Sequence, residues 1–240
     1  MILYFVRHGD PTYDPDALTP LGQRQAESVG KMLARKNIDT IYSSTSNRAV
    51  QTALPLAQML HKEITQLAWC HEKDCRDTFG VVGSDGVERW IFQDPDCMKL
   101  MGSEDVLHMG FQWYEHPSFQ GLPCAQGIAR IGNGADALLR KHGYEHDAEN
   151  HCYRISKEKA DSNERIALFA HEGVSKVFLS HILDIPYPIF TKFLYCHTGV
   201  TTVLFRAKGD VVIPKVLQYS SDTHLYMDGL PTGYQTGMEG

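Results

Sequence analysis

Short apolar runs alternate with helical patterns in the first third of the chain, and this alternation limits the fold more than any other feature. The runs Ile2–Val6, Ile38–Tyr42 and Ile64–Trp69 are typical of buried strands because they are rich in β-branched and aromatic residues. Between them, two longer segments repeat apolar residues at helical spacing. This order of strands and helices predicts an α/β protein with a parallel core sheet.

The helices of this region have recognisable beginnings. Thr19 followed by Pro20 is typical of an N-cap and a first helical residue, and the apolar stripe continues to about Lys36. A loop is expected over residues 10–18, and the hydroxyl-rich turn Ser43–Ser46 precedes the second helix. The rest of the pattern predicts helices over 104–115, 128–139 and 174–183. It also predicts strands over 152–155 and 166–170, which flank a charged turn, and a hairpin of strands 200–206 and 211–219.

Length and composition favour one globular domain. The chain has 240 residues and a formal net charge of −6, and we predict a single domain over 1–225, an insertion or lid at about 73–123 and a mobile tail at 226–240. The sequence has no basic stripe and no membrane-length apolar run, so neither nucleic acid nor a membrane is expected as a partner. The six cysteines form no regular framework, which favours reduced thiols and a cytoplasmic location. Nothing in the sequence indicates an oligomeric state.

Chemically active side chains follow the expected strands at their carboxyl ends. Arg7 and His8 come directly after the first strand, and Arg48 lies just beyond the second. Glu72 follows the third strand, and His171 follows a later apolar run. Because the carboxyl ends of parallel strands meet at one edge of a sheet, we expect these side chains to converge.

Such a set suits an anionic phosphoryl group. Two guanidiniums can bind phosphate oxygens through paired hydrogen bonds, and the start of the helix near Arg48 adds partial positive charge. One imidazole can attack phosphorus while the other binds an equatorial oxygen. A carboxylic acid can protonate the leaving group, so the residues indicate phosphoryl transfer.

Four motifs resemble those of the histidine phosphatase superfamily, which includes cofactor-dependent phosphoglycerate mutases and many phosphatases. They are Val6-Arg7-His8-Gly9, Leu18-Thr19-Pro20-Leu21-Gly22, the stretch from Ile41-Tyr42-Ser43-Ser44 through Arg48 to Ala53, and Phe169-Ala170-His171-Glu172-Gly173. The likeness extends from residue 1 to about 206, outside the insertion. It implies the three-layer αβα sandwich of phosphoglycerate mutase-like proteins, with a mostly parallel central sheet. Neither a cofactor nor a metal is expected, because Arg7, Arg48 and His171 supply the counter-charge for the phosphate.

The resemblance implies roles for single residues. His8 is expected to be the nucleophile that becomes phosphohistidine, with its second ring nitrogen donating to a nearby backbone carbonyl. Glu72 is expected to be the proton donor. Arg7, Arg48 and His171 are expected to bind the phosphate. Three further residues are expected at the substrate or in the loop around it: Thr19, Ser43 and Thr198.

Two of these assignments have competitors in the sequence. Four other carboxylates lie near Glu72 and could replace it as proton donor: Asp74, Asp77, Asp85 and Glu88. One polar segment gathers side chains that can bind metals: Glu145, His146, Asp147, Glu149 and His151. Because this segment shows no helix or strand periodicity, we interpret it as a solvated turn rather than a metal site.

The sequence favours a phosphatase over a mutase. Mutases of the family carry a serine-tryptophan-asparagine sequence soon after Arg-His-Gly and a basic insertion, whereas here Asp10-Pro11-Thr12-Tyr13-Asp14 follows and the insertion has few cations. We predict a metal-independent phosphomonoester hydrolase that acts on a small phosphorylated metabolite through phosphohistidine. Mutase-type phosphoryl transfer and non-catalytic binding of a phosphorylated ligand are the alternatives. The aromatic residues of the insertion are expected mainly in local core.

Overall fold

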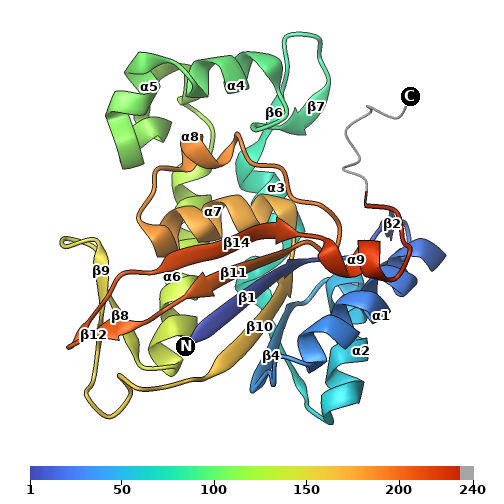
Figure 1. The fold of residues 1–240 in the computed structure, drawn as a ribbon. Helices are drawn as coiled ribbons and strands as arrows, with labels where there is room; N and C mark the ends of the chain where they lie inside the picture. The colour runs from blue at the N-terminus through green and yellow to red at the C-terminus, as the bar shows by residue number, and fades with distance from the viewer. Residues whose placement is uncertain (233–240) are drawn as a thin grey trace.

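A six-stranded sheet forms the centre of the protein in the computed structural model, which describes residues 1–232 (Figure 1). Its strand order is β14-β11-β1-β10-β4-β5, in which β1, β10, β4 and β5 run parallel. Strand β11 runs antiparallel to both of its neighbours, so β14 has the same direction as β1. The sheet strands are β1 (Ile2–Arg7), β4 (Thr40–Ser44), β5 (Ile64–Leu67), β10 (Arg165–Ala170), β11 (Val200–Leu204) and β14 (Lys215–Ser221). This confirms the predicted mostly parallel sheet.

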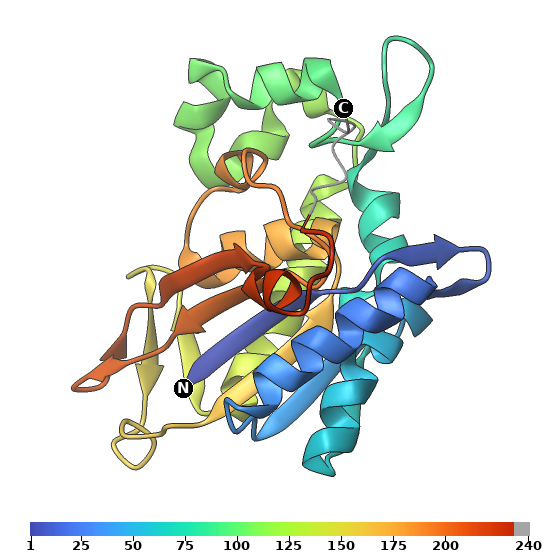
Figure 2. The same ribbon diagram turned by 45° about the vertical axis from the view of Figure 1, so that its right-hand side comes forward.

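Helices cover both faces of this sheet, so the fold is the expected three-layer αβα sandwich (Figures 1 and 2). The helices are α1 (Pro20–Ala34), α2 (Asn47–Leu60), α3 (Glu72–Phe79), α4 (Pro95–Met101), α5 (Glu104–Met109), α6 (Cys124–Lys141), α7 (Glu172–Leu183), α8 (Tyr187–Phe190) and α9 (Thr223–Met227), with the 3-10 helices η1 (Ala68–Cys70), η2 (Gly110–Glu115) and η3 (Pro117–Phe119). In β1, Leu3 and Phe5 belong to the core shared with α6 and α7, while Tyr4 and Val6 belong to the core under α1 and α2. The alternation of side chains along a strand therefore explains why this run is apolar at every position.

The insertion lies over one end of the sheet. It contains α3, the hairpin of β6 (Gly80–Val82) and β7 (Glu88–Trp90), and α4, α5, η2 and η3. Figure 1 shows α3 and the hairpin in teal and α4 and α5 in green, above the sheet. Trp113 and Phe119 are almost fully buried and stack edge to face, which gives the insertion a core of its own continuous with that under α7.

Several local expectations differ from the structure. The expected loop at 10–18 contains a hairpin of β2 (Pro11–Tyr13) and β3 (Asp16–Leu18). The expected helix at 104–115 is divided because Gly110 adopts a φ of +57° and ends α5. The polar segment after Gly143 contains β8 (Tyr144–Asp147), which pairs with β9 (Cys152–Ile155). Two short strands complete this sheet, β12 (Ala207–Lys208) and β13 (Val211–Val212).

The end of the described chain is folded onto the domain. The tail boundary expected at 226 falls within α9, which packs against α1, and Leu230 is buried. Residues 233–240, the remainder of the expected tail, lie outside the described residues. None of the helices within residues 1–232 has the length and apolar character needed to cross a bilayer.

Candidate active site

A cleft of about 510 Å³ opens at the carboxyl edge of the parallel strands. Arg7, His8, Arg48 and Glu72 line it, and they come from the end of β1, the following loop, α2 and α3. The register of β1 against β10 pairs Arg7 with Ala170, which brings His8 next to His171 with a distance of 5.2 Å between their ring centroids. The structure therefore brings together all five residues predicted to take part in catalysis. The other lining residues are Tyr13, His71, Lys73, Arg76, Trp90, Phe92, Gln93 and Glu172.

His8 is held as a neutral imidazole. Its Nδ1 lies 2.7 Å from the carbonyl oxygen of Gly9 and is positioned to donate a hydrogen bond to it. This arrangement leaves the lone pair on Nε2, as a nucleophile requires. Burial, helped by the neighbouring His171 and by the positive charges of Arg7 and Arg48, lowers the pKa of His8 well below its usual value.

Two guanidiniums supply positive charge to the cleft. An Nη of Arg7 lies 2.9 Å from a carboxylate oxygen of Glu172, and the same Nη donates to the backbone carbonyl of Tyr195. An Nη of Arg48 lies 2.7 Å from a carboxylate oxygen of Asp16. Within the described residues, the Nε atoms of both arginines are buried without a hydrogen-bond partner. Because an unpaired buried donor is costly, an anion that accepts from these atoms would bind favourably.

His171 is fully buried and orients Arg48. Its Nδ1 lies 3.3 Å from an Nη of Arg48, and its Nε2 lies 2.9 Å from the hydroxyl of Ser44. Since a guanidinium can only donate, Nδ1 accepts and Nε2 carries the proton. Burial, helped by the positive charge of Arg48, lowers the pKa of His171 well below its usual value, which agrees with a neutral ring.

Glu72 combines an enclosed carboxyl group with a raised pKa. Its Oε1 accepts a hydrogen bond of 3.3 Å from the backbone N–H of Gly173, and its Oε2 is buried without a partner among residues 1–232. Burial raises the pKa of Glu72 to about 7, although the charge of Arg48 acts in the opposite direction. The carboxyl group can therefore hold a proton near neutral pH.

The competing carboxylates have other partners, and none of the four lines the cleft. The pairs are Asp74 with Arg130, Asp77 with Lys73, Asp85 with Arg89, and Glu88 with Arg76. Geometry therefore favours Glu72.

Four predicted substrate-binding residues lie outside the lining of the cleft: His171, whose two ring nitrogens contact Arg48 and Ser44, and the hydroxyl residues Thr19, Ser43 and Thr198. Thr19 caps α1 by accepting a hydrogen bond from the backbone N–H of Gly22, and it donates to a carboxylate oxygen of Asp10. Ser43 donates to the backbone carbonyl of Ser44. The hydroxyls of Thr19 and Ser43 thus hydrogen-bond to the protein itself, and they stabilise the loop and backbone near the cleft.

Thr198 shapes the backbone next to His8. Its φ of +53° is rare for a β-branched residue, and its N–H donates to the carbonyl of His8 over 3.2 Å. Its hydroxyl lies 2.7 Å from the carbonyl of His197 and 3.0 Å from Nε2 of His224. Thr198 thus contacts His8 through the main chain, while its side chain is engaged elsewhere.

Sequence reasoning missed several residues of the cleft. Glu172 orients Arg7, and its position directly after His171 could have indicated this. The ring of Tyr13 lies 5.3 Å from the guanidinium carbon of Arg48, a contact that needs the β2–β3 hairpin.

The insertion supplies the opposite wall. Trp90 and Phe92 line the cleft, so these two aromatic residues are not only local core. The guanidinium of Arg76 lies 5.1 Å from the ring centroid of Trp90. A Cβ on Gly173 would lie 2.6 Å from the Trp90 ring, so a glycine is needed where this wall meets α7.

Comparison with known sequences supports the family resemblance. Residues 3–84 match the model of the histidine phosphatase superfamily, branch 1. Over 71 residues, the chain is 37% identical to a Hydrogenobacter thermophilus protein that is named as a candidate phosphoserine phosphatase. This match covers 26% of the present chain, and the chain spans 35% of the length of that relative.

Solved structures share the fold over nearly the whole chain. A phosphoserine phosphatase variant from Entamoeba histolytica, in complex with phosphoserine, is 21% identical with a TM-score of 0.57, and the match covers 93% of this chain and 98% of that one. A mycobacterial glucosyl-3-phosphoglycerate phosphatase in complex with VO3 is 16% identical with a TM-score of 0.58, covering 92% and 99%. The alpha-ribazole phosphatase of Shigella flexneri is 16% identical with a TM-score of 0.58, covering 92% and 97%.

Proposed function

We propose, on the premise that this chain belongs to the histidine phosphatase superfamily, that it hydrolyses a small phosphomonoester through a phosphohistidine on His8. The observation that carries the proposal is the meeting of a neutral imidazole, two guanidiniums and an enclosed carboxyl group at one cleft. The phosphatase names of the relatives support hydrolysis as the reaction.

In the first step, Nε2 of His8 attacks phosphorus in line with the leaving oxygen. A P–N bond forms and the P–O bond to the leaving group breaks, with its electron pair going to that oxygen. Protonated Glu72 gives its proton to the oxygen, and the alcohol leaves. Arg7 and Arg48 hold the equatorial oxygens, so their charge stabilises the transferring group.

In the second step, Glu72 acts as a base. Its carboxylate accepts a proton from water while the water oxygen forms a bond to phosphorus. The P–N bond breaks, its electron pair returns to Nε2 of His8, and inorganic phosphate leaves. No metal is needed in this scheme because the guanidiniums of Arg7 and Arg48 provide the counter-charge.

Hydrolysis is favoured over mutase-type transfer by the wall that faces the phosphate site. Trp90 and Phe92 form part of this wall, and its two cations already have partners, since Lys73 pairs with Asp77 and Arg76 stacks on Trp90. Such a wall suits a leaving group with apolar surface. All six cysteines are free thiols, which fits a reducing cytoplasmic compartment.

The test is release of phosphate from a generic aryl phosphate by the full chain in the presence of a chelator. We expect turnover by the wild type, loss of at least a thousandfold in His8→Ala, and little change in His108→Ala, whose histidine is exposed on α5. Retention of protein-bound phosphate in acid and in base identifies the intermediate. Phosphohistidine loses its phosphate in acid and keeps it in base. A protein that binds vanadate but neither turns over substrate nor becomes labelled would be a phospho-ligand binder, and the proposal would be wrong.

A further inference from the structure

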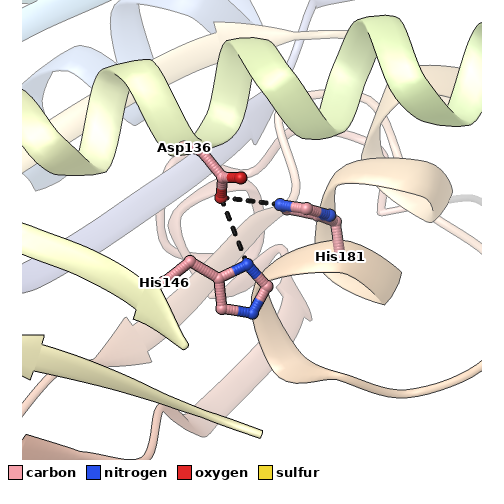
Figure 3. A group of neighbouring side chains, drawn as sticks. All are labelled: Asp136, His146 and His181. Carbon is pink, nitrogen blue, oxygen red and sulfur yellow. Dashed lines mark hydrogen bonds and ion pairs between the residues drawn. The ribbon is translucent and has the colours of Figure 1, made fainter. Parts of the chain in front are cut away.

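A second group of chemically active side chains lies away from the cleft, between α6, β8 and α7. Asp136, His146 and His181 point toward one another from these three elements (Figure 3). An oxygen of Asp136 lies 2.7 Å from Nε2 of His181 and 3.3 Å from Nδ1 of His146. The three atoms all lie within 4.8 Å of one another.

These distances are close to those of a tetrahedral metal site. Nitrogen and oxygen ligands at about 2.0–2.1 Å from a zinc ion in tetrahedral geometry lie about 3.3 Å apart. The contact between Asp136 and His146 has this length, and the contact between Asp136 and His181 would need to open by about half an ångström. Two imidazoles and one carboxylate also form a donor set typical of zinc and related transition metals, whereas magnesium and calcium prefer oxygen ligands alone.

The other ring nitrogen of His146 has the partner that a metal ligand usually has. Its Nε2 lies 3.2 Å from both carboxylate oxygens of Asp184, and the ring of Tyr153 stacks on it with centroids 4.7 Å apart. A carboxylate on the non-ligating nitrogen fixes the orientation of metal-binding histidines. If Nε2 donates to Asp184, Nδ1 faces the Asp136 carboxylate, and either a proton on Nδ1 or a metal ion can lie between these two atoms.

A cavity beside the group leaves room for a further ligand. It has a volume of about 260 Å³, and its lining includes His146, His181, Asp184 and Ser180 together with aromatic residues of η2. Water in this cavity could complete the coordination of an ion held by three protein side chains.

We propose that Asp136, His146 and His181 bind a divalent transition-metal ion of the zinc class, with water as the fourth ligand. The ion joins α6, β8 and α7, so its role is to hold the β8–β9 hairpin against these two helices. It takes no part in the phosphatase scheme, because His171 and His181 lie about 15 Å apart along α7 at 1.5 Å per residue. The site also revises the expectation of no metal. Of the five side chains gathered at 145–151 in the sequence, it uses only His146.

The experiment is calorimetric titration of Zn²⁺ alone into the chelator-treated full chain. We expect one saturable site in the wild type, its loss in Asp136→Asn and His181→Gln, and a weakening of 10- to 100-fold in Asp184→Asn. His108→Ala controls for exposed histidines and His8→Ala for the imidazoles of the cleft, and both should keep the site. Zinc should also raise the melting temperature of the wild type but not that of Asp136→Asn.

Anomalous diffraction from wild-type crystals soaked in zinc gives a result that depends on no variant. Density on Asp136, His146 and His181 supports the proposal. Density only elsewhere, absence of saturable binding, or unchanged affinity in Asp136→Asn would show that these residues form an ion-pair network alone, and would overturn it.

Discussion

Replacing Glu72 by glutamine should make the stability of the protein less dependent on pH. Burial raises the pKa of Glu72 from its usual 4.5 to about 7, and each pKa unit corresponds to 1.36 kcal/mol. The full difference is therefore about 3 kcal/mol. Because the folded-state pKa is the higher one, this contribution is present below pH 4.5 and is lost as the pH rises through 7.

The assay is urea unfolding of wild type and Glu72→Gln at intervals from pH 5 to pH 8.5. Between these limits, the free energy of unfolding of the variant should gain about 2 to 3 kcal/mol relative to the wild type. Glu27→Gln, which changes an exposed carboxylate on α1, should show no comparable trend. A difference between Glu72→Gln and wild type that stays constant over this pH range would refute the idea that burial sets the protonation of Glu72.

Three further predictions concern activity and packing. Since the first chemical step needs protonated Glu72 and neutral His8, kcat/KM should stay level from pH 5 to about 6.5 and fall above about 7, as initial rates across this range will show. Arg48→Ala should lower kcat/KM by about 100- to 1000-fold, and Arg48→Lys should restore little of it because lysine cannot replace the planar fork; full activity in either variant would contradict the assignment. Gly22→Ala should destabilise the fold by about 2 to 4 kcal/mol, since a Cβ would lie 2.1 Å from the carbonyl oxygen of Asp10. Gly102→Ala is the control, because a Cβ there would make no contact closer than 3.4 Å. Thermal unfolding should show a clear loss of stability in the first variant and almost none in the second.

The parts of the fold that sequence predicted well are those with strong local signals. The strand Ile2–Val6 is apolar because both its faces are buried, and α1 begins where Thr19 and Pro20 indicate. Strand β8 was not predicted because it carries charged side chains in place of an alternating apolar pattern. Glu145 forms an ion pair with Arg140, and Asp147 forms one with Arg154. Such pairs depend on tertiary contacts, so periodicity does not reveal them.

The candidate site shows the same division. Residues at strand ends could be found because parallel strands bring their carboxyl edges together, and this holds for Arg7, His8 and His171. Trp90 and Phe92 could not be assigned, because whether an aromatic residue faces a cleft or a core depends on how the insertion folds back. The group of Asp136, His146 and His181 was hidden for a related reason, since its members come from three different elements, α6, β8 and α7.

Burial gives His8 and Glu72 the protonation states that the proposed first step needs. Loss of hydration disfavours the charged form of each group, so it lowers the pKa of His8 and raises that of Glu72. The nearby arginines reinforce the first effect and oppose the second. Glu72 therefore depends more on enclosure than His8 does. The insertion provides that enclosure, because a Cβ on Gly173 would meet both Trp90 and the Glu72 carboxylate within 3.2 Å. Changes in the insertion that let water reach Glu72 should therefore move the alkaline limb of activity to lower pH while leaving His8 neutral.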